Sequence, residues 1–409
     1  MGVIMKNKIK IVSIVISLSA FSVALLFSVF FLFVSCEKQK TEWKGTIEKV
    51  GGVTVAKNSD EPFFGELILD LEEDLIIGNE EDENHMFYRA WNIAVDSKEN
   101  ILILDSGNYR IQKFSRKGEY LITIGKKGEG PGEFSNPTNL FIDSNDNIYV
   151  YDSRRIKVFN ENCQYQREII LKNHINNFAV NLKSEIFAIM FQNTESGEFN
   201  SFIKFDDEGK LLKIIEEFPP AYRQVVKKSG ERTIGFRIDH PYSISSYLSA
   251  GDNKYFVCGQ SLEYKLYVVN DEGDLILRIE KDDPYLPITK KEKDRIKSGF
   301  TYLEKKWPKN VIEEAIQFPS HRPFFEGITV DDKGRIWVMK INSILDKTKE
   351  REFDIFSKDG FFLCKTKLPR SPKVIKNGYI YNLERDKETK GLRIKKIKVN
   401  NWKQIKESI

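Results

Sequence analysis

The chain contains little cysteine and almost no excess of either charge. Its four cysteines, Cys36, Cys163, Cys258 and Cys364, are spread over 409 residues, and this spacing excludes a disulfide scaffold and a cysteine-based metal site. We expect the last three to be small buried residues. Lys plus Arg number 64 against 60 Asp plus Glu. Because a nucleic-acid binder normally gathers a basic excess on one face, this interleaved balance predicts no nucleic-acid partner.

The sequence does contain enough apolar material for a substantial core. Hydrophobic residues make up 41% of the chain and aromatic residues 12%, which excludes wholesale disorder. A single compact core usually stops growing at about 250 to 300 residues. The chain must therefore divide into domains or repeat one structural unit.

The first 36 residues differ in pattern from the rest. Lys6, Lys8 and Lys10 precede 25 uncharged residues, 11–35, and Cys36 follows directly. This arrangement resembles a bacterial lipoprotein signal, in which the cysteine is lipidated and becomes the new N-terminus. The alternative is an uncleaved helical anchor, because this stretch is long enough to span about 30 Å of hydrocarbon. Both interpretations attach the chain to a membrane of the cell envelope, by lipid or by an N-terminal helix. The rest would lie on the extracytoplasmic side, in the periplasm or on the outer surface.

The main feature of the remaining sequence is an internal repeat. Residues 91–124 and 138–170 each contain four short runs of alternating or β-branched residues separated by turn clusters, which is typical of a four-stranded antiparallel unit. Asp143 lies 47 residues after its match, Asp96. The other matching pairs are Asn100 and Asn147, Asp105 and Asp152, Arg110 and Arg155, and Phe114 and Phe159. Weaker copies follow, so six units in all predict an all-β, six-bladed β-propeller closed by radial repetition.

The repeat pattern suggests the domain organisation of the chain. We expect a signal peptide or membrane anchor at 1–35, a tether and N-terminal strand at 36–60, and the propeller at 61–409. One of three strand-like runs before the first unit is expected to complete the last blade; these runs are 45–50, 52–57 and 66–71. Between the fourth and fifth blades, residues from about 287 to 318 predict a small helical insertion, since Thr289 and Glu292 form a capping-box pattern.

A short motif in the first unit carries a family resemblance. Residues 105–114 read DSGNYRIQKF and residues 128–134 read GEGPGEF. The first run resembles the D-x-x-N-x-R-I-x-x-F pattern of NHL-like six-bladed propellers, and the whole chain is similar to bacterial propeller lipoproteins without an assigned role. The resemblance implies the propeller fold for about residues 41–400, and it implies no catalytic residue.

Two motifs that look like ligand-binding loops have structural interpretations. The glycine-rich run 125–134 lacks the Lys-Ser/Thr pair of a phosphate-binding loop, so we interpret it as a crossing between blades. Residues 143–147 start like a calcium loop but lack its glycine at the sixth position. We interpret them as a hairpin turn, together with the similar runs 206–209 and 331–334.

Charged runs occur at both ends of the expected propeller. The basic run 393–399 alternates like a strand whose lysines protect an exposed sheet edge. We interpret the acidic runs 72–74 and 80–83 as solvated loops, because clustered like charges favour exposure. No Ser-His-Asp or Cys-His set is recognisable, so we predict no catalytic residue, no metal and no cofactor.

The four histidines all precede a predicted blade. In a propeller, these segments and the loops between a blade's second and third strands lie on one face, around the central channel. The candidate binding residues on this face are His85, Asn108, Arg110, Arg154, Arg155, His174, His240, His321 and Arg322. Converging imidazoles could hold a transition metal, whereas independent surface or turn histidines need no common site.

These features favour a membrane-anchored, extracytoplasmic propeller that acts as a binding or interaction module. We expect a monomer with an unknown protein or small-molecule ligand. The alternative is a metal-dependent hydrolase or lyase with its site at the channel mouth, similar to gluconolactonase-like enzymes or the NHL-type lyase. A structural protein of the cell envelope is the third hypothesis.

Overall fold

The computed structural model describes residues 42–409, except 195–196, 220–224, 230–231, 237, 253 and 349. The chain divides into two units, Met1–Glu42 and Trp43–Ile409. The predicted signal or anchor and Cys36 lie outside the described residues. Within the described part of the chain, no helix is long and apolar enough to cross a membrane.

Blades one to three are four-stranded antiparallel sheets whose strands follow one another in the chain. Blade one contains β4 (Ala90–Val95), β5 (Ile101–Asp105), β6 (Arg110–Phe114) and β7 (Tyr120–Ile124). Blade two contains β8 (Pro137–Ile142), β9 (Ile148–Asp152), β10 (Arg155–Phe159) and β11 (Tyr165–Ile170). Blade three contains β12 (Ile175–Val180), β13 (Ile186–Thr194), β14 (Gly197–Phe205) and β15 (Leu211–Glu217). The glycine-rich run 125–134 connects blades one and two, as predicted.

Blades four and five repeat the same order further along the chain. Blade four contains β18 (Ser246–Gly251), β19 (Tyr255–Gln260), β20 (Lys265–Asn270) and β21 (Leu275–Lys281). Blade five contains β22 (Phe325–Val330), β23 (Ile336–Lys340), β24 (Arg351–Phe356) and β25 (Phe362–Leu368). A separate two-stranded sheet precedes blade four and consists of β16 (Val225–Ser229) and β17 (Arg232–Phe236).

The N-terminal strands join two different blades. Blade six contains β26 (Val374–Lys376), β27 (Tyr379–Arg385), β28 (Leu392–Val399) and, as its outer strand, β3 (Leu71–Ile77). Closure by an N-terminal strand is therefore confirmed, although β3 begins where the expected run 66–71 ends. The other two expected runs form β1 (Gly45–Val50) and β2 (Val53–Asn58). They extend blade four instead, because β2 pairs in parallel with β21.

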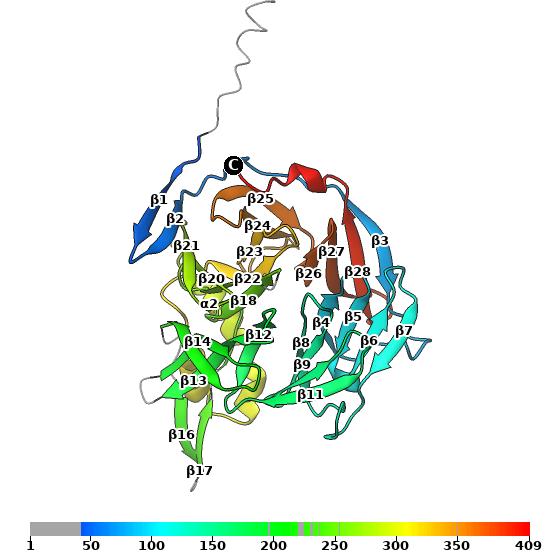
Figure 1. The fold of residues 1–409 in the computed structure, drawn as a ribbon. Helices are drawn as coiled ribbons and strands as arrows, with labels where there is room; N and C mark the ends of the chain where they lie inside the picture. Colours follow the sequence, from blue (N-terminus) through cyan, green and yellow to red (C-terminus); the bar gives the residue numbers. More distant parts are fainter. Residues whose placement is uncertain are drawn as a thin grey trace, which may run out of the picture. The chain divides into compact units, whose positions relative to one another are not determined.

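The first strands of the six blades form a closed cycle, in which β4, β8, β12, β18, β22 and β26 each contact the next and β26 returns to β4. Figure 1 shows these inner strands side by side around a common centre. This arrangement confirms the predicted all-β, six-bladed propeller.

Each gap between neighbouring blades has its own hydrophobic cluster, and there are six such clusters. The strand ILILD at 101–105 shows how one strand serves two gaps. Ile101 and Ile103 pack toward blade six, whereas Leu102 and Leu104 pack toward blade two. Successive side chains of a strand point to opposite faces of the sheet. A strand inside a blade that lies between two other blades is therefore buried on both faces, which explains why it is apolar at consecutive positions.

Charged side chains reinforce the closure of blade six. Lys395 and Lys396 lie 2.8 Å from carboxylate oxygens of Glu73 and Asp74 on the neighbouring β3. The predicted strand at 393–399 is confirmed, but the edge is wrong, because β28 lies between β27 and β3. The prediction that 72–74 forms a loop is wrong, since these residues belong to β3, but their side chains are exposed as predicted.

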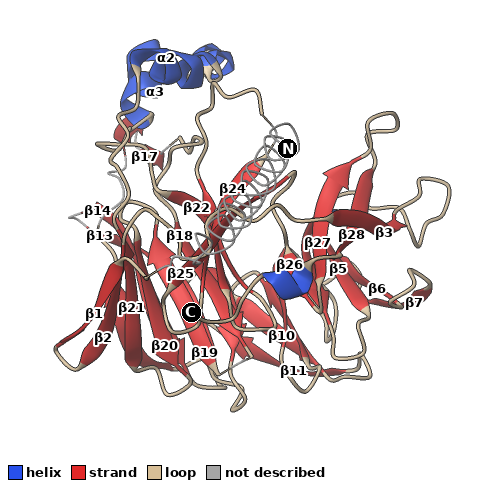
Figure 2. Cartoon of the chain, turned by 90° about the horizontal axis from the view of Figure 1, so that it is seen from above, coloured by secondary structure: helices blue, strands red, loops and turns tan. Residues whose placement is uncertain are grey.

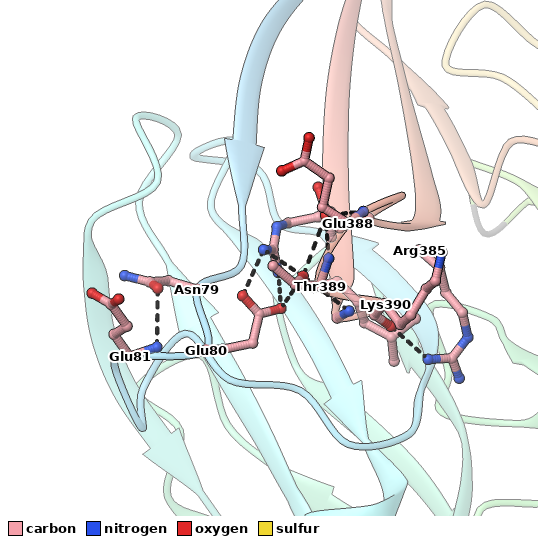
Figure 3. Close-up of polar contacts among 11 residues, drawn as sticks. Asn79, Glu80, Glu81, Arg385, Glu388, Thr389 and Lys390 are labelled. Carbon is pink, nitrogen blue, oxygen red and sulfur yellow. Dashed lines mark hydrogen bonds and ion pairs between the residues drawn. The ribbon is translucent and has the colours of Figure 1, made fainter.

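Glu80 makes a second ionic contact just after β3. Its carboxylate accepts hydrogen bonds from both terminal nitrogens of Arg393, at 2.5 and 2.7 Å, and from Thr389 Oγ1 at 3.0 Å. These bonds hold the pKa of Glu80 down to about 2, chiefly through Arg393. Figure 3 shows the Glu80 carboxylate directed at the turn that carries Thr389. The N-terminal segment is therefore held to blade six by opposite charges as well as by strand pairing.

Two helices, α2 (Lys290–Ser298) and α3 (Lys309–Ala315), lie in the chain between β21 and β22. Figure 2 shows them packed together at one end of the sheets. The predicted capping box is present, because Thr289 and Glu292 bond each other's backbone N–H groups. The helices share a separate small core with residues such as Ile238, Tyr242 and Ile344, which come from other loops.

Candidate functional site

Similar capped turns follow the inner strands of blades one, two and five. Asp96 Oδ1 accepts hydrogen bonds from the backbone N–H groups of Lys98 and Asn100, at 3.0 and 2.7 Å. Asp143 and Asp331 make the same pair of bonds in blades two and five, and Asp206 makes it in an outer turn of blade three. A short carboxylate can cap its own turn in this way. The predicted hairpin turns are therefore confirmed.

The inner strands surround a cavity of about 740 Å³. Its wall includes residues from β4, β8, β12, β18, β22 and β26, so the cavity is the central channel of the ring. Ligand pockets usually measure roughly 300 to 1,000 Å³. The channel therefore has the size of a binding site for a small molecule or for the end of a larger one.

Three asparagines form a continuous amide arc along one side of this channel. Asn92 Nδ2 donates to Asn139 Oδ1, and Asn139 Nδ2 donates to Asn177 Oδ1, both at 2.8 Å. Asn177 Nδ2 then donates to the carbonyl of Leu248 at 2.9 Å. A primary amide has two N–H donors and a carbonyl with two lone pairs. Each asparagine therefore keeps hydrogen-bonding capacity beyond the arc, next to the cavity that all three line.

β-Bulges place other side chains near the start of the inner strands. The strand register shifts at Trp91 in blade one and at Glu326 in blade five. Bulges re-aim the side chain of the extra residue. Both residues line the cavity, and the indole of Trp91 is 55% exposed.

The wall opposite the amide arc carries titratable groups. Tyr247 lies at the same register level as the arc, one blade beyond Asn177, and burial raises its pKa to about 12. Burial also raises the pKa of Glu326, although Arg351 lies 2.8 Å from its carboxylate and opposes the change. Surrounding protein lowers the pKa of Lys373 on blade six. The channel thus has an amide wall and a wall with phenol, carboxylate and amine groups.

The residues of the NHL-like motif have structural partners outside the channel. Asp105 is fully buried, and its carboxylate accepts hydrogen bonds from the backbone N–H groups of Tyr88 and Arg89. Asn108 Nδ2 donates to the same carboxylate at 2.7 Å. Arg110 donates to backbone carbonyls of Glu83 and Met86. The motif therefore fixes the lead-in segment, by which we mean the residues just before a blade's inner strand.

The four histidines are held in separate contacts. His85 Nδ1 lies 2.6 Å from Asp82 Oδ2, and His174 Nδ1 lies 3.4 Å from the hydroxyl of Tyr151. His240 Nε2 and His321 Nε2 donate to the carbonyls of Gln317 and Leu262, both at 2.9 Å. Among the described residues, no group of three or more His, Cys, Asp or Glu side chains is placed to hold a metal ion.

The remaining candidate arginines also make local contacts. Arg155 pairs with Glu168 at 3.2 Å, and Arg322 pairs with the buried Glu292 at 2.9 Å. Arg154 has a left-handed backbone conformation, with φ of 68°, and its carbonyl accepts from Leu171 N. None of the nine sequence-predicted binding residues, all of which the structure describes, lines the cavity.

The sequence contains a signal for the amide arc that repeat analysis can detect. Asn92, Asn139 and Asn177 each stand four residues before the turn-capping Asp96, Asp143 and Asn181. The spacing N-x-x-x-D/N thus occurs once in each of blades one to three. Aligning the repeats on their turns, and then comparing the positions upstream, identifies this set of channel residues.

Comparisons with known proteins support the fold. Residues 90–251 match a family described as a 6-bladed beta-propeller. A Bacteroides fragilis protein described as exported has 13% sequence identity and a TM-score of 0.50, with 84% of this chain and 99% of that chain covered. A member of the DUF4221 family from Bacteroides vulgatus has 12% identity and a TM-score of 0.47, over 81% of this chain and 98% of that chain.

A gluconolactonase from Xanthomonas campestris has 12% identity and a TM-score of 0.40, over 76% of this chain and 87% of that chain. No protein with a curated description matches the sequence. At such identities the likeness concerns the fold alone. The narrower NHL-like and lipoprotein resemblances stay predictions.

Proposed function

We propose that this chain is a membrane-anchored, extracytoplasmic propeller that binds a ligand in its central channel. The observation that carries the proposal is the cavity of about 740 Å³, which the inner strands of all six blades line. Polar side chains from five blades reach it, namely the three arc asparagines, Tyr247 and Lys373 among them. Binding is the function we favour because the cavity combines this size with a continuous row of amides that can bond a ligand.

Membrane attachment rests on the sequence pattern that ends at Cys36. Mass spectrometry of the chain purified from membranes tests it. A lipidated cysteine predicts a mature chain that begins at Cys36 with an acyl mass added, whereas an uncleaved anchor predicts the full 409-residue mass.

The channel is tested by filling it. Thr329 lines the cavity from β22, and Thr329→Trp places an indole there. Lys309→Trp adds the same group at an exposed position of α3 and serves as the matched control. We would measure melting temperatures with panels of uncharged oligosaccharides, short peptides and organic acids, since a ligand that binds only the folded state raises the melting temperature.

We expect at least one compound class to stabilise the wild type and Lys309→Trp but not Thr329→Trp. Equal stabilisation of all three proteins would place the ligand elsewhere on the molecule. No stabilisation by any class would contradict the proposal.

A further inference from the structure

Two exposed aromatic rings lie beside the start of β4. Trp91 is 55% exposed and Tyr88 is 72% exposed. Trp91 lines the channel, and three residues of extended chain span at most about 10 Å. Large aromatic side chains usually bury most of their surface. Trp91, left open at the edge of a cavity, therefore indicates a contact surface, and the exposed Tyr88 lies three residues before it in the chain.

The position of the Tyr88 ring is set by the backbone beneath it. A Cβ atom added at Gly107 would lie 2.2 Å from Tyr88 Cδ1, so the absence of a side chain at Gly107 provides the space for the ring. The backbone N–H of Tyr88 also donates to the buried carboxylate of Asp105. The ring is thus fixed from below while its other face meets solvent. Such preorganisation lowers the entropy cost of binding.

The amide arc provides both hydrogen-bond donors and hydrogen-bond acceptors next to Trp91. Asn92 follows Trp91 directly and begins the arc through Asn139 to Asn177. Asn92 and Asn139 have donor and acceptor capacity left for a ligand, whereas Asn177 has one N–H donor left, because its Oδ1 also accepts from Phe178 N. A sugar hydroxyl is likewise both a donor and an acceptor, so a row of amides matches a row of hydroxyls.

The charges at the cavity disfavour an anionic ligand. Glu326 is paired with Arg351, which offsets its negative charge. Asp252 and Asp332 line the cavity near the turns that end the inner strands, and their negative charges would repel an anion. An uncharged ligand that is rich in hydroxyl groups fits these constraints best.

Building on the proposed channel-binding function, we propose that the ligand is a neutral saccharide. Different sugar units would stack on Trp91 and on Tyr88, and hydroxyls would bond the amide arc. The C–H face of a pyranose ring is apolar and flat, and it packs on an aromatic face, whereas the ring edge carries the hydroxyls. Peptides are the competing class, and the test includes them.

The test uses the full chain in an amine-oxide detergent, because maltoside and glucoside detergents carry sugar headgroups. Calorimetric titrations would compare neutral tetrasaccharides of glucose, xylose and N-acetylglucosamine with size-matched tetrapeptides. The variants are Trp91→Ala, Trp91→Phe and the control Tyr302→Ala, which removes a ring that is 63% exposed on the helical insertion. Truncating a central aromatic contact should weaken saccharide binding roughly tenfold or more, with partial recovery in Trp91→Phe and a change within about twofold in Tyr302→Ala.

The outcomes separate this inference from the proposed function. Tetrasaccharide binding that depends on Trp91 supports both. Tetrapeptide binding that Thr329→Trp abolishes, without saccharide binding, overturns the saccharide and keeps the channel. Saccharide binding that is unchanged in Trp91→Ala overturns the aromatic platform. If neither panel binds the wild type, both ideas are wrong.

Discussion

Blades one and two differ from blades four and five in the chemistry of one repeated position, the last residue of the second strand. In all four blades this residue pairs with the first residue of the inner strand. It is Asp105 or Asp152 in blades one and two, and Gln260 or Lys340 in blades four and five. The position therefore has the same pairing in all four blades. In blades one and two its side chain accepts hydrogen bonds, whereas in blades four and five its side-chain nitrogen donates.

The position ties down the preceding segment in both halves. Asp152 accepts hydrogen bonds from Ser135 N and Asn136 N in the lead-in segment of blade two. Gln260 Nε2 donates to the carbonyl of Pro219, at 3.1 Å, in the segment before blade four. Lys340 pairs with Asp283 in the segment before blade five. The same position in the repeat can thus hold the preceding segment either with a side-chain acceptor or with a side-chain donor.

The two halves also differ in what their lead-in segments contain. The segments before blades one and two are short and bonded to a strand carboxylate, whereas the segment before blade five contains α2 and α3. In blade five the carboxylate that collects these hydrogen bonds lies on α2 and not on a strand. The buried Glu292 accepts from Tyr242, Ser343 and Arg322, which come from three different segments. Three variants test how much each junction contributes.

The largest effect is expected at Asp105. Asp105→Ala leaves two backbone N–H groups and the Asn108 amide without their buried acceptor, and it removes the carboxylate that lies 3.5 Å from Arg110 Nε. An unsatisfied buried donor costs about 1 to 3 kcal/mol, so we expect a loss of about 3 kcal/mol in the free energy of unfolding. Urea denaturation measures it.

Two further variants control for size and for general loss of charge. Asp105→Asn keeps one carbonyl acceptor and should cost less than Asp105→Ala. Asp207→Ala removes an exposed carboxylate that lies 3.6 Å from Arg167, and it should change stability by about 0.5 kcal/mol or less. A loss at Asp105 no larger than this would refute the idea that the motif fixes the lead-in segment.

The second prediction concerns Glu292 and acid. Burial by itself would raise the pKa of Glu292, but hydrogen bonds from Tyr242, Ser343 and Thr289 outweigh it and lower the pKa from 4.5 to about 2. A depressed carboxyl pKa stabilises the fold above the unfolded-state pKa, and this contribution disappears as the pH falls from about 4.5 toward 2. Glu292→Gln should therefore cost about 2 kcal/mol at neutral pH and much less near pH 2.

Urea titrations of Glu292→Gln and the wild type at pH 7 and pH 3 would show the difference converging. Glu304→Gln removes an exposed carboxylate from the same insertion and should leave the pH profile unchanged. A gap between Glu292→Gln and the wild type that stays constant with pH would assign the effect to packing and not to the carboxylate.

The sequence predicted the ring more completely than its channel. Matching Asp96 with Asp143 identifies a turn that blades one, two, three and five cap within five residues, and local signals of this kind repeat visibly. Closure by an N-terminal strand was expected from one of the runs 45–50, 52–57 and 66–71, but not from β3, whose pairing with Lys395 and Lys396 joins segments more than 300 residues apart. Nothing in the acidic run 72–74 alone distinguishes a strand from a solvated loop.

The site was harder to predict because its residues act across blades. Each histidine precedes an inner strand, yet none lines the cavity, so position along the chain alone does not predict contact with the channel. The arc asparagines were overlooked because a single Asn in a strand carries no signal by itself. Thr289 and Glu292 were correctly predicted as a capping box, whereas the bonds of Glu292 to Tyr242 and Ser343 depend on the tertiary fold.

The smallest of the three effects is expected at Gln260, the donor counterpart of Asp105. Gln260→Met keeps the length of the side chain and removes its single bond to the carbonyl of Pro219. One neutral hydrogen bond contributes about 1 kcal/mol to stability, and a carbonyl near the surface can bond water instead. We therefore expect a loss of about 1 kcal/mol or less, measured by urea denaturation beside Asp105→Ala.

Gln166→Met is the matched control for Gln260→Met, because Gln166 is exposed on β11 and bonds only the nearby carbonyl of Gln164 among its described contacts. It should be nearly neutral. If Gln260→Met cost as much as Asp105→Ala, one hydrogen bond would hold its segment as firmly as a carboxylate with several donors. The two junctions would then differ in which group donates the hydrogen bond but not in their contribution to stability. The expectation that Gln260 contributes less than Asp105 would be wrong.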